Sequence, residues 1–236
     1  MNIYHVYSNF DTAREFRYEV AFKTWKLCNF IDIPISDKEL KPTSFLKDSD
    51  DRILPFFPDL IDRSIEKIKN EENYIIFFTN LDSCLIPSIY DELLKIDDYN
   101  TQVYVRTDIP YEYDVPLKLE DFINMETYAG KDGFGFTKNF WINNRSTFKR
   151  MIFGAEFWDY IFYLQLKTLS NVSSINKILY HQKHYQKWCD IVYRLTLSSQ
   201  IYNIKIAKEF LYVNKNLIDQ LWNFENSWEK ELFNKI

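Results

Sequence analysis

Glycine and proline are scarce in this 236-residue chain, and both are unevenly placed. All four glycines lie between Gly130 and Gly154, and none of the seven prolines lies beyond Pro116. Both residues break helices, so a segment without them can stay helical over a long distance. We therefore expect strands, loops and helices to alternate in the first half and the last third to be largely helical.

Cysteine is also rare, and long apolar runs are missing. The three cysteines, Cys28, Cys84 and Cys189, form no CxxC pair, which excludes the usual structural zinc site. A low, odd number of cysteines is typical of a reducing compartment. The N-terminus has no signal-peptide pattern, and no apolar run is long enough to span a bilayer. The sequence predicts a soluble, cytoplasmic protein without a transmembrane segment.

The sequence has no basic arm. Its net charge is −5 with both signs interspersed, which argues against broad electrostatic capture of nucleic acid. Hydrophobic residues make up 46% of the chain and aromatic residues 18%, enough for a sizeable core and too much for a disordered chain. The length fits one large domain, or one domain with a helical extension. The abundance of Lys, Asn, Ile and Phe is typical of an AT-rich genome, bacterial or viral, phages included.

The most informative stretch is Tyr74–Ser83. Five apolar residues run together and end at a polar tip, as in a buried strand. Asn80 and Asp82 follow two positions apart, so in extended backbone their side chains face the same way. Open α/β sheets bind ligands beyond such strand ends, and a carboxylate there suits Mg²⁺ or Mn²⁺. The alternative is that both residues only form the turn and cap the next helix.

Apolar spacing predicts several other elements around this strand. A polar loop with Ser8 and Asn9 joins the first predicted strand to a helix, and Arg14 at its start faces either an anionic ligand or solvent. The predicted strands are Ile3–Tyr7, Cys28–Ile35 and Gln102–Arg106, and the predicted helices are Thr12–Leu27, Pro58–Lys69, Pro87–Leu94 and Met151–Leu166. This alternation predicts an α/β fold of the doubly wound kind.

Three of the four glycines lie in the segment Ala129–Phe136. Glycine lets a ligand approach the backbone closely, and Asp132 sits between Gly130 and Gly133. The segment is neither a P-loop nor a dinucleotide fingerprint, because neither spacing is present. It is predicted to be a glycine-rich turn before a strand, with or without a ligand.

Two further pairs of titratable residues stand out. Glu156 and Asp159 are three apart in a predicted helix, so they are neighbours on one face, for acid–base chemistry or as surface charge. His181 and His184 share the same spacing, and two imidazoles on one helical face could bind a divalent metal or be structural.

Taken in order, these segments resemble the nucleotide-sugar-dependent glycosyltransferases of the GT-A type. The resemblance covers about the first 190 residues. It implies a Rossmann-like GT-A fold with a central mixed, mostly parallel sheet over residues 1–190, and C-terminal helices packed on it over 191–236. The residues that carry it are Ser8-Asn9, Arg14, Thr24-Trp25, Arg52-Ile53-Leu54-Pro55, Asp59, Phe78-Thr79-Asn80-Leu81-Asp82, Gly130-Lys131-Asp132-Gly133-Phe134, Gly154-Ala155-Glu156-Phe157-Trp158-Asp159, His181, His184 and Trp188.

The resemblance also implies roles. In such enzymes an Asp-x-Asp motif at a strand end binds Mn²⁺ or Mg²⁺, which holds the donor diphosphate; here Asn80 stands in place of the first Asp. By analogy, the metal ligands are Asp82, His181 and His184, the donor contacts are Ser8, Asn9, Arg14, Arg52, Asp59, Asn80 and Gly130, and the catalytic acids are Asp132, Glu156 and Asp159. The donor is a nucleotide-diphosphate sugar, UDP-sugars first among them.

The expected reaction is attack of an acceptor hydroxyl on the anomeric carbon. A carboxylate such as Glu156 or Asp159 accepts the proton if the enzyme inverts. The acceptor stays open: a glycan, a lipid-linked sugar, a protein or a modified nucleic-acid base. Two other functions are also considered. One is another phosphate-handling enzyme, such as a nucleotidyltransferase or a phosphatase; the other is a non-catalytic binding protein with a decayed site.

Overall fold

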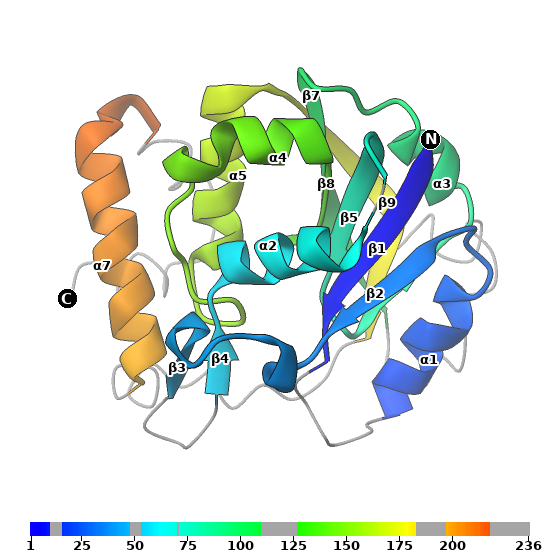
Figure 1. Cartoon of the computed structure of the whole chain (residues 1–236), viewed down its shortest axis with the longest axis horizontal. Coiled ribbons are helices and arrows are strands. Elements are labelled where there is room, and N and C mark those ends of the chain that lie inside the picture. Colours follow the sequence, from blue (N-terminus) through cyan, green and yellow to red (C-terminus); the bar gives the residue numbers. More distant parts are fainter. Residues whose placement is uncertain (10–15, 48–52, 70, 110–126, 183–196, 218–236) are drawn as a thin grey trace.

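A seven-stranded mixed sheet forms the centre of the protein (Figure 1). The computed structural model describes residues 1–9, 16–47, 53–69, 71–109, 127–182 and 197–217. The strands, in the order in which they lie across the sheet, are β2 (Ile31–Ile35), β1 (Asn2–Ser8), β5 (Tyr74–Thr79), β8 (Thr127–Thr137), β7 (Asn100–Ile109), β9 (Asn171–Gln182) and β6 (Ser83–Leu85).

Helices cover both faces of this sheet (Figure 1). One face carries α2 (Phe57–Lys67), α4 (Lys138–Asn144) and α5 (Trp158–Leu169), with α7 (Ser198–Val213) packed outside α5; the other carries α1 (Phe16–Trp25) and α3 (Ile89–Leu93). A two-stranded sheet of β3 (Phe45–Lys47) and β4 (Ile53–Pro55) lies near the start of α7, and short 3-10 helices span Asp37–Glu39, Pro42–Ser44, Arg145–Thr147 and Lys215–Leu217.

The alternation of side chains along β5 builds an apolar core on each side of the sheet. Ile76 and Phe78 enter the core under α2, α4 and α5, whereas Ile75 and Phe77 enter the core under α1 and α3. All six residues of β5 are buried. The prediction of a buried strand ending in a polar tip is therefore confirmed.

The predicted α/β fold is confirmed at the level of a mixed sheet with helices. The sheet is not mostly parallel, however. Among the described strands, β1–β2, β1–β5 and β7–β9 pair in parallel, whereas β5–β8, β7–β8 and β6–β9 pair antiparallel. Two of the antiparallel pairs arise because β8 is inserted between β5 and β7 and runs against both, and the third arises because the edge strand β6 runs against β9.

The expectation of a largely helical last third is wrong for Asn171–Gln182, which form the twelve-residue strand β9. His181 therefore lies on a strand, not on a helical face. The helix predicted from Met151 begins only at Trp158, because Gly154 and Phe157 have positive φ angles of 79° and 66° that no α-helix continues. Glu156 thus precedes the helix that carries Asp159, so the predicted i, i+3 pair on one helical face is also wrong.

The glycine-rich segment is part of a strand rather than a turn. Gly133 and Gly135 lie within β8, and a Cβ atom on Gly133 would come within 2.8 Å of Leu179 Cδ1 and 3.0 Å of Tyr104 Cβ. Here glycine allows neighbouring side chains to pack against the strand backbone. Phe134 and Phe136, at alternate positions of β8, enter the core.

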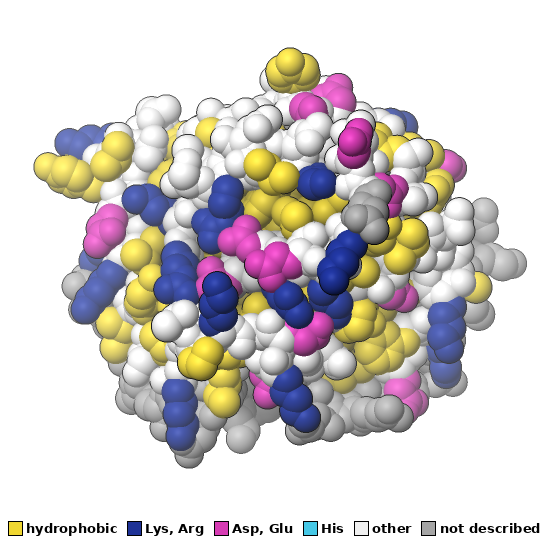
Figure 2. Space-filling model, viewed as in Figure 1, with side chains coloured by type: hydrophobic (Ala, Val, Ile, Leu, Met, Phe, Trp, Pro, Cys, Tyr) yellow, Lys and Arg dark blue, Asp and Glu magenta, His cyan; other side chains and the backbone are white. Residues whose placement is uncertain are grey.

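The exposed side of α2 carries both signs of charge. Figure 2 shows Lys and Arg side chains interspersed with Asp and Glu on this face of the molecule. Arg63 pairs with Glu66, and Lys67 pairs with Glu39. In the described parts of the chain, no helix combines the length and the apolar character that crossing a membrane requires.

Candidate active site at the carboxyl edge of the sheet

The polar tip after β5 is a tight turn that leads directly into β6. The backbone N–H of Asn80 donates to the carbonyl of Asp132 at 3.3 Å, and the N–H of Ser83 donates to the carbonyl of Asn80 at 3.2 Å. The chain therefore passes within a few residues from β5, in the middle of the sheet, to β6, its outermost strand. Asp82 lies in this turn, and its side chain is 15% exposed.

Asp82 meets His181 at this edge. In the sheet, His181 of β9 is paired with Ser83 of β6 on one side and with Asp108 of β7 on the other. His181 Nε2 lies 3.0 Å from Asp82 Oδ2, and His181 Nδ1 lies 3.6 Å from Asp108 Oδ1. The structure thus brings together two of the three residues that the resemblance assigned to a metal.

The two carboxylates decide the charge of His181. Burial alone would lower its pKa, but the negative charge of Asp82 and the hydrogen bonds to Asp108 and Asp82 outweigh burial. The nearby Arg106 opposes them only in part. The result is a pKa raised from 6.5 to about 9, so His181 is an imidazolium cation at neutral pH.

Arg106 extends this ion-pair network to β8. Its Nε lies 2.9 Å from Asp108 Oδ1, and one terminal nitrogen lies 3.3 Å from Asp132 Oδ2. The Asp132 side chain is 7% exposed. Asp82, His181, Asp108, Arg106 and Asp132 therefore form one continuous chain of charged contacts, which we call the edge network.

A β-bulge places Asp132 in the edge network. Tyr104 of β7 pairs with Gly133, but the next residue, Val105, pairs with Lys131, so Asp132 is an extra residue in β8. The second register shift in the same pairing lies between Val105 and Thr107, at the level of Gly130. Bulges re-aim side chains and are frequent beside active sites.

Asp159 and Lys131 adjoin the edge network on the α5 side. The backbone N–H of Lys131 donates to Asp159 Oδ2 at 3.3 Å, and Lys131 Nζ lies 4.3 Å from the centre of the Tyr160 ring. Burial raises the pKa of Asp159, the charge of Asp132 adds to the rise, and the Lys131 charge and two backbone hydrogen bonds oppose it. A carboxylate with a raised pKa is a better proton acceptor near neutral pH.

The donor atoms at this edge are not arranged as a metal centre. Among the described residues, no group of three or more His, Cys, Asp and Glu side chains has a geometry that could hold a metal ion. Asp82 and His181 instead make an ion pair, and an imidazolium nitrogen cannot ligate. A divalent cation would have to break this pair, so within the part of the chain that the structure describes Asp82 and His181 do not form a ready metal site.

Three other residues predicted to contact the donor, Ser8, Asn9 and Gly130, lie at the end of β1, directly after β1 and in β8. Val6 of β1 pairs with Phe78 of β5, so Ser8 and Asn9 reach the same edge of the sheet as Asn80. The N–H of Asn9 donates to the Ile35 carbonyl. Gly130 is buried within β8.

Asp59 and Glu156 take part in other contacts. Asp59 Oδ2 lies 2.7 Å from a terminal nitrogen of Arg150, and Asp59 Oδ1 lies 3.7 Å from a terminal nitrogen of Arg145. The Glu156 backbone is held by α7, because its N–H donates to Gln200 and its carbonyl accepts from Asn203. The predicted site residues Arg14, Arg52 and His184 lie outside the described residues.

Arg106 and Asp108 were not among the residues expected in the site. A signal for them exists in the sequence: Arg106-Thr107-Asp108 follows an apolar strand, with two polar residues two positions apart, as in Asn80-Leu81-Asp82. The same argument about strand ends applies to both segments. The argument from strand ends does not show that β9 lies next to β7, where His181 comes to lie beside Asp108.

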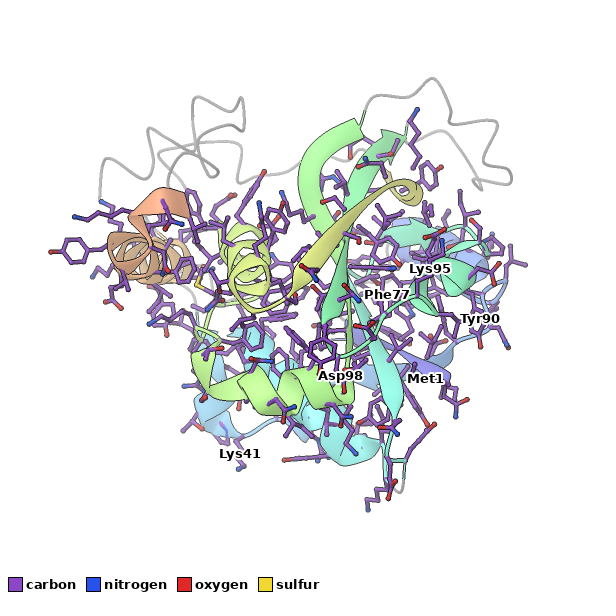
Figure 3. The ribbon with its side chains drawn as sticks, turned by 90° about the horizontal axis from the view of Figure 1, so that it is seen from above. Met1, Lys41, Phe77, Tyr90, Lys95 and Asp98 are labelled. Atoms are coloured by element: carbon purple, nitrogen blue, oxygen red, sulfur yellow. The ribbon has the colours of Figure 1, made fainter. Side chains whose placement is uncertain are left out.

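A separate hollow of about 390 Å³ lies at the opposite edge of the sheet. Its lining includes Met1, Tyr74 and Asp98. Tyr74 begins β5 and Asp98 precedes β7, and both strands lead to the edge network at their other ends, whereas Met1 precedes β1. Figure 3 labels Met1 and Asp98 at this end. Asp98 is already bonded to Thr137 and Asn139. This hollow is thus distinct from the edge network.

No protein-family model matches the sequence, and no curated protein matches it.

Proposed function

We propose that this protein is a GT-A type glycosyltransferase that transfers a sugar from a nucleotide-diphosphate sugar to a hydroxyl acceptor. The observation that carries the proposal is the edge network, in which charged side chains from β7, β8, β9 and the β5–β6 turn converge at one edge of an α/β sheet. Ligands bind at this kind of edge in open α/β sheets. UDP-sugars are the donors to be tested first.

The proposal assigns charge stabilisation in this transfer to the two cations of the edge network, Arg106 and His181, which its three carboxylates hold in place. The acceptor oxygen attacks the anomeric carbon, the bond from that carbon to the diphosphate oxygen breaks, and the diphosphate leaves with the bonding electron pair. Arg106 is a permanent cation that can hydrogen-bond phosphate oxygens as their charge develops. The imidazolium of His181 adds a second positive charge beside it.

Asp159 is the proposed proton acceptor if the transfer inverts the anomeric centre. Its raised pKa suits a general base, and its contact with the Lys131 N–H fixes it beside the bulge. Asp132, held by Arg106 in the same bulge, is the proposed contact to the sugar hydroxyls. No step in this scheme passes through a metal ion, because the described donor atoms, which do not include His184, are not arranged for one.

A cytoplasmic location belongs to the same proposal, because nucleotide sugars are found there. Cys28 and Cys84 are both free thiols, which fits a reducing compartment. The acceptor could be a glycan, a lipid-linked sugar, a protein or a modified nucleic-acid base.

The direct test is calorimetric binding of UDP, GDP and CDP to the purified chain, each with Mn²⁺, with Mg²⁺ and with EDTA. We expect one nucleotide diphosphate to bind, and the matching nucleotide sugar to be hydrolysed slowly without an acceptor. Replacing Arg106 by Gln should weaken binding about ten- to a hundredfold, the usual cost of losing a charged hydrogen-bond partner.

The matched control is Asp97→Asn. Asp97 is exposed at the opposite edge of the sheet, where it accepts hydrogen bonds from Tyr99 and Asn100. It should change neither binding nor hydrolysis. If none of the three nucleotides binds in any of the buffers, the proposal is wrong; turnover of a generic phosphate ester would then favour a different phosphate-handling enzyme.

A further inference from the structure

The turn that carries Asp82 is anchored at both of its ends by side chains from outside the edge network. Thr79 is the last residue before the turn, and Ser83 is the first residue after it. Both are fully buried. What holds these two residues therefore sets where Asn80 and Asp82 point.

His5 holds the first end. It is a fully buried residue of β1, and its Nε2 lies 2.8 Å from the hydroxyl oxygen of Thr79. On its other side, Nδ1 lies 3.0 Å from a carboxylate oxygen of Asp32, which is 46% exposed. The ring also stacks on Phe77 at 5.5 Å between centroids, so its orientation is fixed from several directions.

Trp25 holds the second end. It is the last residue of α1, and its indole N–H donates to the backbone carbonyl of Ser83 at 2.7 Å. The preceding residue, Thr24, accepts a hydrogen bond from the N–H of Leu85 at 2.9 Å. The end of α1 is therefore bonded along the whole of β6.

The two anchors are also in contact with each other. The rings of His5 and Trp25 meet edge to face, with centroids 4.5 Å apart and planes at 86°. Such aromatic pairs are geometrically specific and strengthen packing. One rigid unit therefore determines the positions of Thr79 and Ser83, although its members come from β1 and α1.

We propose that His5 and Trp25 form a positioning clamp for the Asn80–Asp82 turn. Because Ser83 is also the sheet partner of His181, the clamp fixes both members of the Asp82–His181 pair. It touches no residue expected to react, and its role is to keep the turn in one conformation. This inference rests on the proposed function only for its ligand-binding readout; the conformational readout is independent of it.

The conformational test is amide hydrogen exchange in Thr79→Val and Trp25→Phe. Thr79→Val keeps the size of the side chain, Trp25→Phe keeps a smaller aromatic ring, and each removes one anchoring hydrogen bond. The reporters are the N–H groups of Asn80, Ser83 and Leu85. We expect them to exchange about tenfold faster than in the unmodified chain, because local opening becomes easier when an anchor is lost.

Thr101→Val is the matched control. Thr101 is buried in β7, and its hydroxyl lies 2.8 Å from that of Ser170. Both lie toward the other edge of the same sheet. The control loses the same kind of hydrogen bond, so it should change overall stability by a similar amount. The exchange rates of the three reporter amides, each measured relative to the amide of Ile76 in the middle of β5, should stay as they are in the unmodified chain.

The functional test is the affinity for UDP of the same variants. Thr79→Val should bind UDP about tenfold more weakly, and Thr79→Ser, which restores the hydroxyl, should recover most of the affinity. Unchanged exchange at the reporters, or an equal rise in all three variants, would overturn the clamp. So would a loosened turn that leaves UDP affinity intact. If the unmodified chain binds no nucleotide diphosphate, the proposed function fails, and the exchange rates alone decide the clamp.

Discussion

His181 Nε2 lies 3.0 Å from Asp82 Oδ2, although 99 residues separate the two in the chain. The contact exists because β6 and β9 pair antiparallel, with Ser83 opposite His181. This contact links the turn after β5 to β9, the strand next to the outermost strand β6. The charge of this pair should therefore be visible in the pH dependence of the whole protein.

We expect the stability of the protein to fall in the alkaline range. His181 has a folded pKa of about 9 against 6.5 when unfolded, so its contribution is complete below pH 6.5 and is lost as the pH rises through about 9. A gap of this size is worth about 3 kcal/mol. Urea unfolding at several pH values measures it.

The matched variant is His181→Gln, which should flatten the alkaline part of the profile. Asp82→Asn should flatten it in part, because it removes one of the two carboxylates that raise the pKa of His181. A profile that is the same in all three proteins would contradict the assigned ion pair.

The opposite sign is expected for His5 in the acidic range. Burial lowers the pKa of His5 below 6.5, although Asp32 opposes this. The unfolded chain therefore binds a proton that the folded chain does not, and stability should fall as the pH falls through 6.5. Between pH 7 and pH 5, the free energy of unfolding should change less with pH in His5→Gln than in the unmodified chain. This expectation holds even if the substitution lowers stability at every pH. An unchanged slope would show that His5 is not the group responsible.

Asp159→Asn should reduce sugar transfer about a hundredfold or more, the usual contribution of a general base. The raised pKa of Asp159 further predicts that turnover of the unmodified enzyme rises with pH as this group loses its proton. Steady-state rates across pH, with a UDP-sugar donor, measure both effects. Glu156→Gln serves as the comparison, since Glu156 precedes α5 and its backbone is bonded to α7. An equal loss in both variants would argue against a specific role for Asp159.

Gly133→Ala should destabilise the fold by about 1–3 kcal/mol, as overpacking does in other cores. The added methyl group would meet Leu179, Tyr104 and Phe77, and the contact with Tyr104 Cβ cannot be relieved by rotating a side chain. Gly135→Ala is the milder comparison, because the methyl group there meets the mobile ends of Ile96 and Leu93. Urea unfolding ranks the two variants; the reverse order would mean that the sheet adjusts around Gly133.

Much of the secondary structure could be predicted from local pattern. The apolar run before Asn80 predicts a buried strand because only a strand with both faces covered accepts such a run. The local signals failed where a backbone conformation overrides spacing. At Phe157 a positive φ delays the start of α5, and the apolar spacing from Met151 onward contains no sign of this.

The candidate site could be predicted only in part. Asp82 and His181 were both expected there, and the structure places them in contact. Their shared metal ligation stays a prediction, and in the structure the two side chains form an ion pair. Arg106 was missed as a site residue, because a lone arginine at a strand end has no distinctive spacing.

Local sequence was enough to predict that β1, β5 and β7 are strands and that β5 ends in polar residues, since both depend on neighbours along the chain, but it did not predict β9. The position of β8 between β5 and β7, its bulge at Asp132 and the contact of His181 with Asp82 are visible only in the folded protein. Strand order and register depend on packing between residues far apart in sequence, and a shift of one residue would turn each of these side chains to the other face of the sheet.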